Sequence, residues 1–95
     1  LYIDPVSRSA VFSVGLQGGG TVDVASGITL SNDTWYHIVA TWDRAQSIAR
    51  LYINGLAQGT VSIPKWGNTS NAFSWGAADN GFAMNGTLDE LGVWN

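Results

Sequence analysis

The sequence predicts an all-β protein built as an antiparallel β-sandwich, and three observations lead to that prediction. Apolar residues alternate with polar ones at period two in several short segments, as in strands with one buried face. Turn residues, mainly glycine, asparagine and proline, separate these segments at short intervals. No window places apolar residues at i, i+3, i+4 and i+7 over three helical turns, so no helix is required. Seven short strands separated by turns are typical of a sandwich.

The first strands come from the N-terminal third of the chain. Residues 10–16 carry apolar side chains at every second position and end at the triple glycine 18–20. Residues 21–25 form the next short strand, which closes at Ser26-Gly27. Residues 1–3, ahead of Asp4-Pro5, are expected to be the tail of another strand whose beginning lies outside this chain.

The central strands follow as a connected group. Residues 35–42 and 48–53 are predicted strands separated by a break at 43–46. Asn54-Gly55 is the strongest two-residue hairpin signal and sends the chain back through residues 56–63. Within that last strand Gly59 is the expected bulge, and Pro64 ends it. The alternation in 35–42 puts one set of side chains on one face and a second set on the other: Tyr36, Ile38, Ala40 and Trp42 against His37, Val39 and Thr41.

Two further strands are predicted near the C-terminus, at residues 72–75 and 87–94, with the loop 77–85 between them. Because a small sandwich needs its aromatic residues for packing, we assign three of the five tryptophans to the core: Trp35, Trp42 and Trp94. Asp89 shares a face with Leu91 and Val93, so its carboxylate is expected at a sheet edge, where it accepts backbone N–H bonds.

Composition excludes several classes of protein. The chain has 95 residues, of which 45% are hydrophobic and 12% charged, which excludes a disordered tail and a coiled coil. Its net charge of −3 gives no basic footprint, so nucleic acid is not an expected partner. No apolar run approaches the ~20 residues of a membrane span, so membrane insertion is not expected. With no cysteine, disulfides and thiolate metal sites are also excluded.

Three segments carry a more specific pattern. Residues 27–43 (GITLSNDTWYHIVATWD) contain a turn, then Trp-x-His with alternating apolar residues, then Thr-x-Asp. Residues 50–55 (RLYING) form a hairpin motif, and residues 82–95 end in LDELGVWN. In this order the motifs resemble the laminin G-like family of concanavalin A-like jelly rolls. The resemblance implies that residues 1–95 form one laminin G-like domain with a concanavalin A-like jelly roll. It also implies that this domain is a fragment, because family members carry further strands before the position of Leu1. Either the natural protein continues at both ends, or another chain supplies the missing strands.

The residues do not favour catalysis in this chain. Glycosidases need a pair of carboxylates at a defined separation, but the only glutamate is Glu90, and its neighbour Asp89 points to the opposite strand face. Glycosidases on the related fold carry a Glu-x-Asp-x-Glu type strand, which has no match here. No Gly-x-Ser-x-Gly elbow is present, and we interpret His37 as a packed strand residue. We therefore predict that the chain is not an enzyme.

Aromatic and amide side chains suggest a carbohydrate site. Tryptophan can stack on the apolar face of a sugar while asparagine bonds its hydroxyls. Trp66 precedes a polar loop, and Trp75 ends the next predicted strand just before Gly76. The alternative for both rings is burial in the core. The candidate carbohydrate-binding residues are Trp66, Asn68, Asn71, Trp75 and Asn80.

Calcium is the metal considered, because the available ligands are oxygens. The resemblance implies one Ca²⁺ at the rim of the sandwich, held by loop acids and carbonyls. Asp79 and Asn80, in the loop before Gly81, have the right chemistry, although neither matches a family motif. The alternative interpretation of this loop is a solvated turn.

The leading functional hypothesis is a non-catalytic recognition module that binds carbohydrate or a glycosylated surface within a larger protein. By resemblance, that protein is extracellular, cell-surface or particle-associated, and neighbouring domains or subunits are possible partners. A second hypothesis is a structural or assembly module whose sheet edges pair with neighbouring subunits. An accessory domain attached to a hydrolase is the third.

Overall fold

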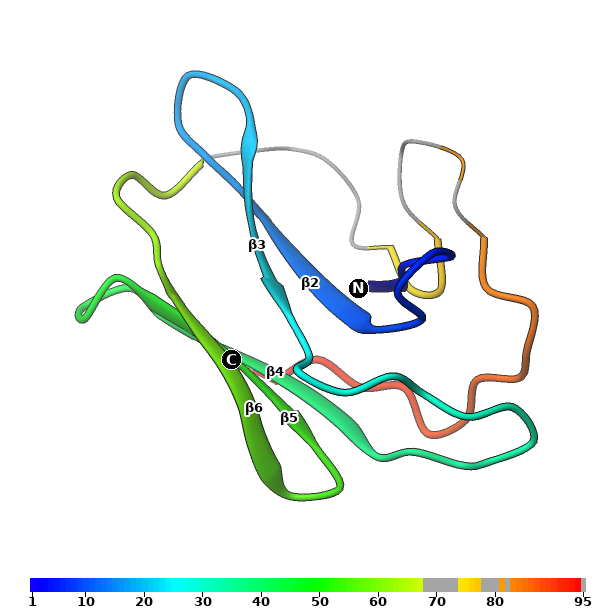
Figure 1. Ribbon diagram of the computed structural model, residues 1–95. Coiled ribbons are helices and arrows are strands. Elements are labelled where there is room, and N and C mark those ends of the chain that lie inside the picture. The colour runs from blue at the N-terminus through cyan, green and yellow to red at the C-terminus, as the bar shows by residue number, and fades with distance from the viewer. Residues whose placement is uncertain (68–73, 78–80, 82, 95) are drawn as a thin grey trace.

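The computed structural model describes residues 1–67, 74–77, 81 and 83–94. Over these residues the protein is all-β, with two three-stranded antiparallel sheets and no helix (Figure 1). The predicted fold class is therefore confirmed. Most of the strands lie in the segments that the period-two alternation and the glycine-containing turns predicted.

The first sheet has the order β1-β2-β3, formed by β1 (Tyr2–Ile3), β2 (Ala10–Gly15) and β3 (Thr21–Ala25). The glycines at 18–20 all have positive φ, between 83° and 105°, a conformation that only glycine adopts without strain. They reverse the chain, so that Phe12 pairs with Val24 and Val14 with Val22. Residues 2–3 add a short edge strand, as predicted from the apolar residues before Asp4-Pro5.

The second sheet has the order β4-β5-β6, formed by β4 (Ile38–Asp43), β5 (Ile48–Ile53) and β6 (Leu56–Ser62). The predicted hairpin is confirmed, because Asn54 (φ 51°) and Gly55 (φ 80°) both adopt the left-handed conformation that a type I′ turn requires. Asn54 also joins the hairpin to the residue before β4, since its Oδ1 accepts from the His37 amide at 2.9 Å.

Gly59 lies next to a bulge in β6, and its backbone is close to β3 of the other sheet. Leu51 pairs with Gly59 and Tyr52 with Ala57, which leaves Gln58 as the extra residue of a bulge. A Cβ at position 59 would lie 2.8 Å from Val24 Cγ2 and 2.9 Å from the Ala25 carbonyl oxygen. The absence of a side chain therefore lets β6 approach β3.

The hydrophobic core lies between the two sheets. The sheets meet mainly where β3 packs against β5 and β6. Alternate residues of β5 are buried, and the fully buried side chains with the largest volumes are Leu51, Ile53 and Ile63. The remaining members of the buried cluster are Ala10, Phe12, Val24 and Ala49.

The third predicted strand is shorter than expected but keeps its predicted faces. The sequence predicted residues 35–42, whereas β4 begins at Ile38. Tyr36, Ile38 and Ala40 are half-buried against the core, as the alternation predicted. The interpretation of His37 as a packed strand residue is wrong, because His37 precedes β4 and its side chain is exposed.

The assignment of three tryptophans to the core is wrong. Trp35, Trp42 and Trp94 are 69%, 40% and 82% exposed. Trp35 precedes β4 and lies in the turn-rich segment, so no strand orients its ring inward. Trp42 lies on the edge strand β4, where its ring retains a tilted contact with Phe12 at 6.2 Å between centroids.

The strand predicted at residues 87–94 is also wrong, because the structure assigns no strand there. Glu90 has φ 50°, which interrupts an extended backbone. The Asp89 carboxylate accepts from the Glu90 amide at 2.8 Å, so it stabilises a local turn and not a sheet edge. Because this segment is not paired in a sheet, its apolar side chains, including Trp94, are exposed. Of the strand predicted at 72–75, residues 72 and 73 lie outside the described residues, and Ser74 and Trp75 are not in a strand.

Candidate functional site

Trp66 lies at one end of the sandwich, where the chain leaves β6. Pro64 ends that strand, and the next residues are joined to the end of β2 by backbone bonds. The Gln17 amide donates to the Lys65 carbonyl at 3.2 Å, and the Gly67 amide donates to the Gly15 carbonyl at 2.9 Å. These two bonds bracket an isolated bridge between Leu16 and Trp66. The backbone of Trp66 is therefore held in place, and its half-buried indole packs against the core.

Arg44 is an exposed charged residue at this end of the molecule. Its guanidinium carbon lies 5.9 Å from the centroid of the Trp66 ring, within the range of a cation–π contact. Arg44 belongs to the turn between β4 and β5, which Asp43 stabilises by accepting from the amides of Ala45 and Gln46 at 2.9 and 3.0 Å. The carboxylate of Asp43, the acidic residue next to Arg44 in the sequence, therefore accepts from backbone amides of the turn.

The Trp66 indole nitrogen is a polar atom without a partner. Nε1 is buried, and no acceptor for it exists among residues 1–67, 74–77, 81 and 83–94. Leaving a buried donor unsatisfied costs about 1–3 kcal/mol. The site therefore contains one N–H group that is buried away from solvent and one exposed guanidinium, which can donate to oxygen atoms.

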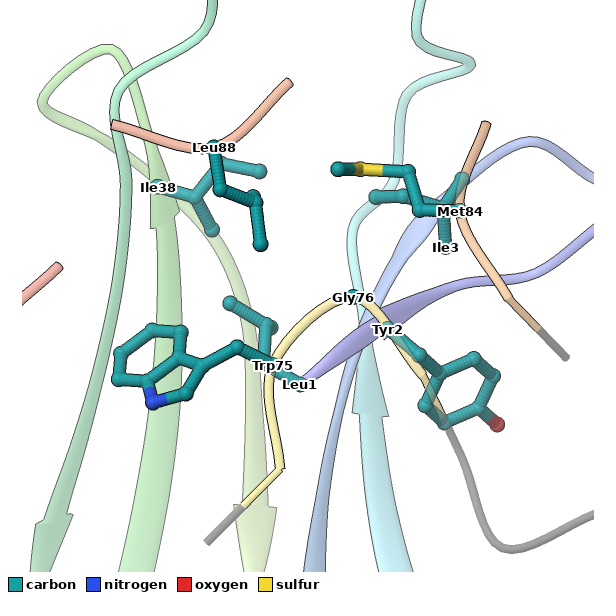
Figure 2. A pocket seen from close by; sticks show the side chains of 8 residues that line it. All are labelled: Leu1, Tyr2, Ile3, Ile38, Trp75, Gly76, Met84 and Leu88. Atoms are coloured by element: carbon teal, nitrogen blue, oxygen red, sulfur yellow. The ribbon is translucent and has the colours of Figure 1, made fainter. Parts of the chain in front are cut away.

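Trp75 lies in a different environment, beside β1. The Gly76 amide donates to the Leu1 carbonyl at 2.9 Å, and Figure 1 shows segment 74–77 next to the N-terminus. Figure 2 shows the Trp75 ring on one side of an apolar cavity of about 30 Å³. An apolar cavity that binds benzene has a volume of about 150 Å³, so this one is too small for a sugar ring. The other residues lining it are Leu1, Tyr2, Ile3, Ile38, Gly76, Met84 and Leu88.

The structure does not place Trp66 and Trp75 on one common platform. Trp66 bridges to Leu16, which follows the end of β2. Segment 74–77 instead contacts the N-terminus beside β1, which pairs with Val11 in β2. The two contacts are therefore five residues apart along β2, which corresponds to about 16 Å in an extended strand. The other candidate residues, Asn68, Asn71 and Asn80, lie outside the described residues.

The predicted calcium ligands Asp79 and Asn80 also lie outside the described residues. Within the part of the chain that the structure describes, no group of three or more histidine, aspartate, glutamate or cysteine side chains could hold a metal ion. Calcium binding stays a prediction.

Sequence reasoning missed Arg44 as a neighbour of Trp66. The two residues are far apart in the chain, but sheet register brings their segments together. Asp43 pairs with Ile48, and Ile48 pairs with Ser62, so the turn after β4 and the segment after β6 lie at the same end of the sheet. Pairing the three predicted strands in antiparallel order would have revealed this proximity.

Comparison with known proteins identifies the family. The family described as the concanavalin A-like lectin/glucanases superfamily, of laminin G type, matches residues 1–95. No curated protein and no solved structure gives a significant match to the chain. The described part of the chain contains no helix that is long and apolar enough to span a membrane. The family match and the two antiparallel sheets agree with the motifs in the sequence, and the chain therefore belongs to the laminin G-like proteins of the concanavalin A-like superfamily.

Proposed function

We propose that this chain is a non-catalytic recognition module that binds carbohydrate, or a glycosylated surface, within a larger extracellular, cell-surface or particle-associated protein. The observation that carries the proposal is the Trp66 site, where an indole held by backbone bonds lies beneath an exposed arginine. Membership of a superfamily of lectins and glucanases supports a recognition role in general.

The chemistry of the Trp66 site suits a ligand rich in hydroxyl groups. The exposed part of the indole offers apolar surface, while the exposed Arg44 guanidinium offers hydrogen-bond donors. Asn68 and Asn71 follow Gly67 in the sequence, and their side-chain amides can both donate and accept hydrogen bonds. We propose the position of Trp66 as the site to be tested first. Trp75, which lies beside β1, is tested as a separate position, and the three asparagines stay predictions.

A non-catalytic role is supported by the small number of acidic groups suited to glycoside cleavage. The chain has a single glutamate, Glu90, which is exposed next to Asp89. The Asp89 carboxylate already accepts from the Glu90 amide, which stabilises a turn. Glycosidases instead need two carboxyl groups that face a shared substrate across about 5–10 Å.

A second candidate function rests on the exposed apolar residues of the C-terminal segment. Leu88, Leu91 and Val93 are 44–56% exposed, and Trp94 is more exposed still. Several exposed apolar side chains within one short segment are a feature of surfaces that contact other proteins. This supports the alternative of an assembly module. Sedimentation velocity on the wild-type chain and on Trp94→Ser would test it, since assembly through this segment predicts a mass above that of one chain that falls in the variant.

The experiment that tests the leading proposal is a glycan array probed with the folded chain in calcium and again with a chelator. Trp66→Ala and Trp75→Ala are compared with Trp94→Ala, which removes an exposed indole outside the predicted site. We expect binding by the wild-type chain, loss in Trp66→Ala, and retention in Trp94→Ala. Loss of binding on chelation would support the calcium loop at Asp79 and Asn80.

Each variant must first show a cooperative melt, because Trp66 and Trp75 are half-buried. Trp66→Phe provides a second test, since it keeps an apolar ring and removes the indole N–H group. A folded wild-type chain that binds no glycan would contradict the proposal and favour the assembly module. Retained binding in Trp66→Ala would contradict the site.

A further inference from the structure

We propose that Met84 is an oxidation site, and that conversion of its thioether to the sulfoxide by a hydroperoxide releases segments 74–77 and 83–94 from the first sheet. The chain thus carries a redox switch that does not depend on the proposed function at Trp66. Met84 is the single methionine of the chain, so methionine oxidation can act at one position only.

The backbone of Met84 attaches the C-terminal segment 83–94 to the N-terminus. The Met84 amide donates to the Gly76 carbonyl at 2.6 Å, and the Gly76 amide donates to the Leu1 carbonyl at 2.9 Å. An isolated bridge between Ala77 and Ala83 lies beside these bonds. Two successive backbone bonds therefore connect the C-terminal segment to the residue that precedes β1.

The side chain of Met84 adds an apolar contact to this attachment. It is half-buried and lines the apolar cavity of about 30 Å³. Figure 2 shows Met84 and Ile3 on one side of the cavity, with Leu88 and Ile38 on the other. Because Ile3 belongs to β1 and Ile38 to β4, both sheets and the C-terminal segment line one cavity. A flexible thioether is well suited to fill an irregular space of this kind.

The sulfur lies beside an exposed part of the backbone. A Cβ at position 86 would lie 3.6 Å from Met84 Cε and 3.8 Å from its Sδ, and Gly86 itself is exposed. A Cβ at position 76 would likewise lie 3.8 Å from Met84 Cε. Since neither glycine has a side chain that covers the thioether, a small oxidant can reach the sulfur from solvent.

Oxidation would replace an apolar sulfur with a polar group. The sulfur lone pair attacks one oxygen of hydrogen peroxide, so that an S–O bond forms, the O–O bond breaks and water is released. The sulfur loses two electrons, which the peroxide gains. The cavity lining is almost entirely apolar, and Figure 2 shows the Tyr2 hydroxyl directed away from it. A sulfoxide without a hydrogen-bond partner is unfavourable there, so the oxidised side chain would leave the cavity.

The test treats the folded 95-residue chain with hydrogen peroxide and follows amide hydrogen exchange, while peptide mass spectrometry locates the added oxygen. The variant Met84→Leu keeps an apolar side chain that peroxide does not oxidise. Met84→Gln places a polar group at the same position. The Ser26 amide, which donates to the Ala10 carbonyl at 2.7 Å within the first sheet, is the internal control.

We expect the sulfoxide to form at Met84 and the amides of Gly76 and Met84 to exchange at least roughly ten-fold faster, as local opening of these segments requires. The Ser26 amide should keep its rate. Treatment with methionine sulfoxide reductases and a thiol should restore slow exchange. Met84→Gln should exchange fast without peroxide, and Met84→Leu should exchange slowly with and without it.

Four results would overturn the inference. The first is a Met84 that stays reduced at a peroxide concentration that oxidises the urea-unfolded chain. The second is a sulfoxide that leaves both amides protected. Faster exchange in peroxide-treated Met84→Leu would assign the effect to another residue. If the variants do not fold, the reductase step on the wild-type chain decides, because exchange that stays fast after the sulfoxide is reduced would also contradict a switch at Met84.

Discussion

At the residue scale, Gly59 shows how a single missing side chain permits the contact between the two sheets. Its position serves two purposes, because the strand carries a bulge there and because β3 lies directly against it. Either requirement alone would favour glycine, and together they make the position sensitive to any Cβ atom.

Gly59→Ala should lower the free energy of unfolding by about 1–3 kcal/mol, since the added Cβ would overlap Val24 and the Ala25 carbonyl. Gly27→Ala is the control, because its nearest atoms lie at 3.8 Å, an ordinary contact. Urea denaturation of both variants measures the difference. Equal midpoints for the two variants would contradict the close packing of β3 on β6.

The ionised carboxylate of Asp4 stabilises the turn between β1 and β2. Its Oδ1 accepts from the amides of Ser7 and Val6 at 2.7 and 3.0 Å and from the Ser7 hydroxyl at 2.9 Å. The backbone bond from Ser7 is the largest cause that lowers the pKa of this carboxyl below its ordinary value. Because the folded pKa is lower than the unfolded one, the stabilisation is present above the unfolded pKa and is lost as the pH falls through the folded pKa.

Asp4→Asn should therefore lower the melting temperature at pH 6, and the difference from the wild-type chain should shrink below the ordinary pKa of an aspartate. Thermal melts of both proteins between pH 7 and pH 2.5 give this comparison. A difference that stays constant over the whole range would show that ionisation of Asp4 does not matter.

At the scale of elements, the β5–β6 hairpin organises the second sheet. The turn residue Asn54 bonds both ways with the residue before β4, since its Oδ1 accepts from the His37 amide and its amide donates to the His37 carbonyl. The hairpin thus fixes where β4 begins as well as its own register. This explains why β4 starts at Ile38, directly after that residue.

Asn54→Ala should cost about 1–3 kcal/mol, because alanine tolerates the left-handed backbone poorly and leaves the His37 amide without its acceptor. Asn54→Asp keeps the acceptor and tolerates that backbone, so it should cost less. Chemical denaturation of the two variants decides the point. An equal loss in both would indicate that neither the conformation nor the bond contributes as described.

At the scale of the whole molecule, stability depends on the layer of apolar side chains between the sheets. Leu51→Ala should destabilise the protein by about 2–5 kcal/mol, because its side chain is fully buried in this layer. Leu56→Ala, at a position 69% exposed, should change stability by less than about 0.5 kcal/mol. Calorimetric unfolding measures both, and similar losses would contradict the sandwich.

The sequence predicts correctly those elements that are determined by residues close together in the chain. The bounds predicted for two strands, residues 21–25 and 48–53, agree with the structure because alternation and flanking turns define them. The hairpin at Asn54-Gly55 is likewise determined by two adjacent residues.

Features that depend on distant partners could not be predicted in the same way. Residues 87–94 alternate like a strand, but an extended segment becomes a strand only where a neighbour pairs with it, and Glu90 turns the backbone instead. The exposure of Trp35 and Trp94 follows from the same cause, since neither ring lies on a paired strand. The contact between Arg44 and Trp66 depends on the register of three strands, which no single segment reveals.

The central claim of this account is that carbohydrate binds at Trp66, and the indole N–H signals of the five tryptophans test it most directly. After assignment by single substitution, a ¹⁵N–¹H spectrum is recorded while a glycan that the array identifies is added. We predict a saturable shift of the Trp66 signal, whose buried Nε1–H has no acceptor among the described residues, while the exposed Trp94 signal stays in place. An unchanged Trp66 signal alongside saturable shifts at another tryptophan would contradict the site, and no shift at any of the five would contradict recognition of that glycan.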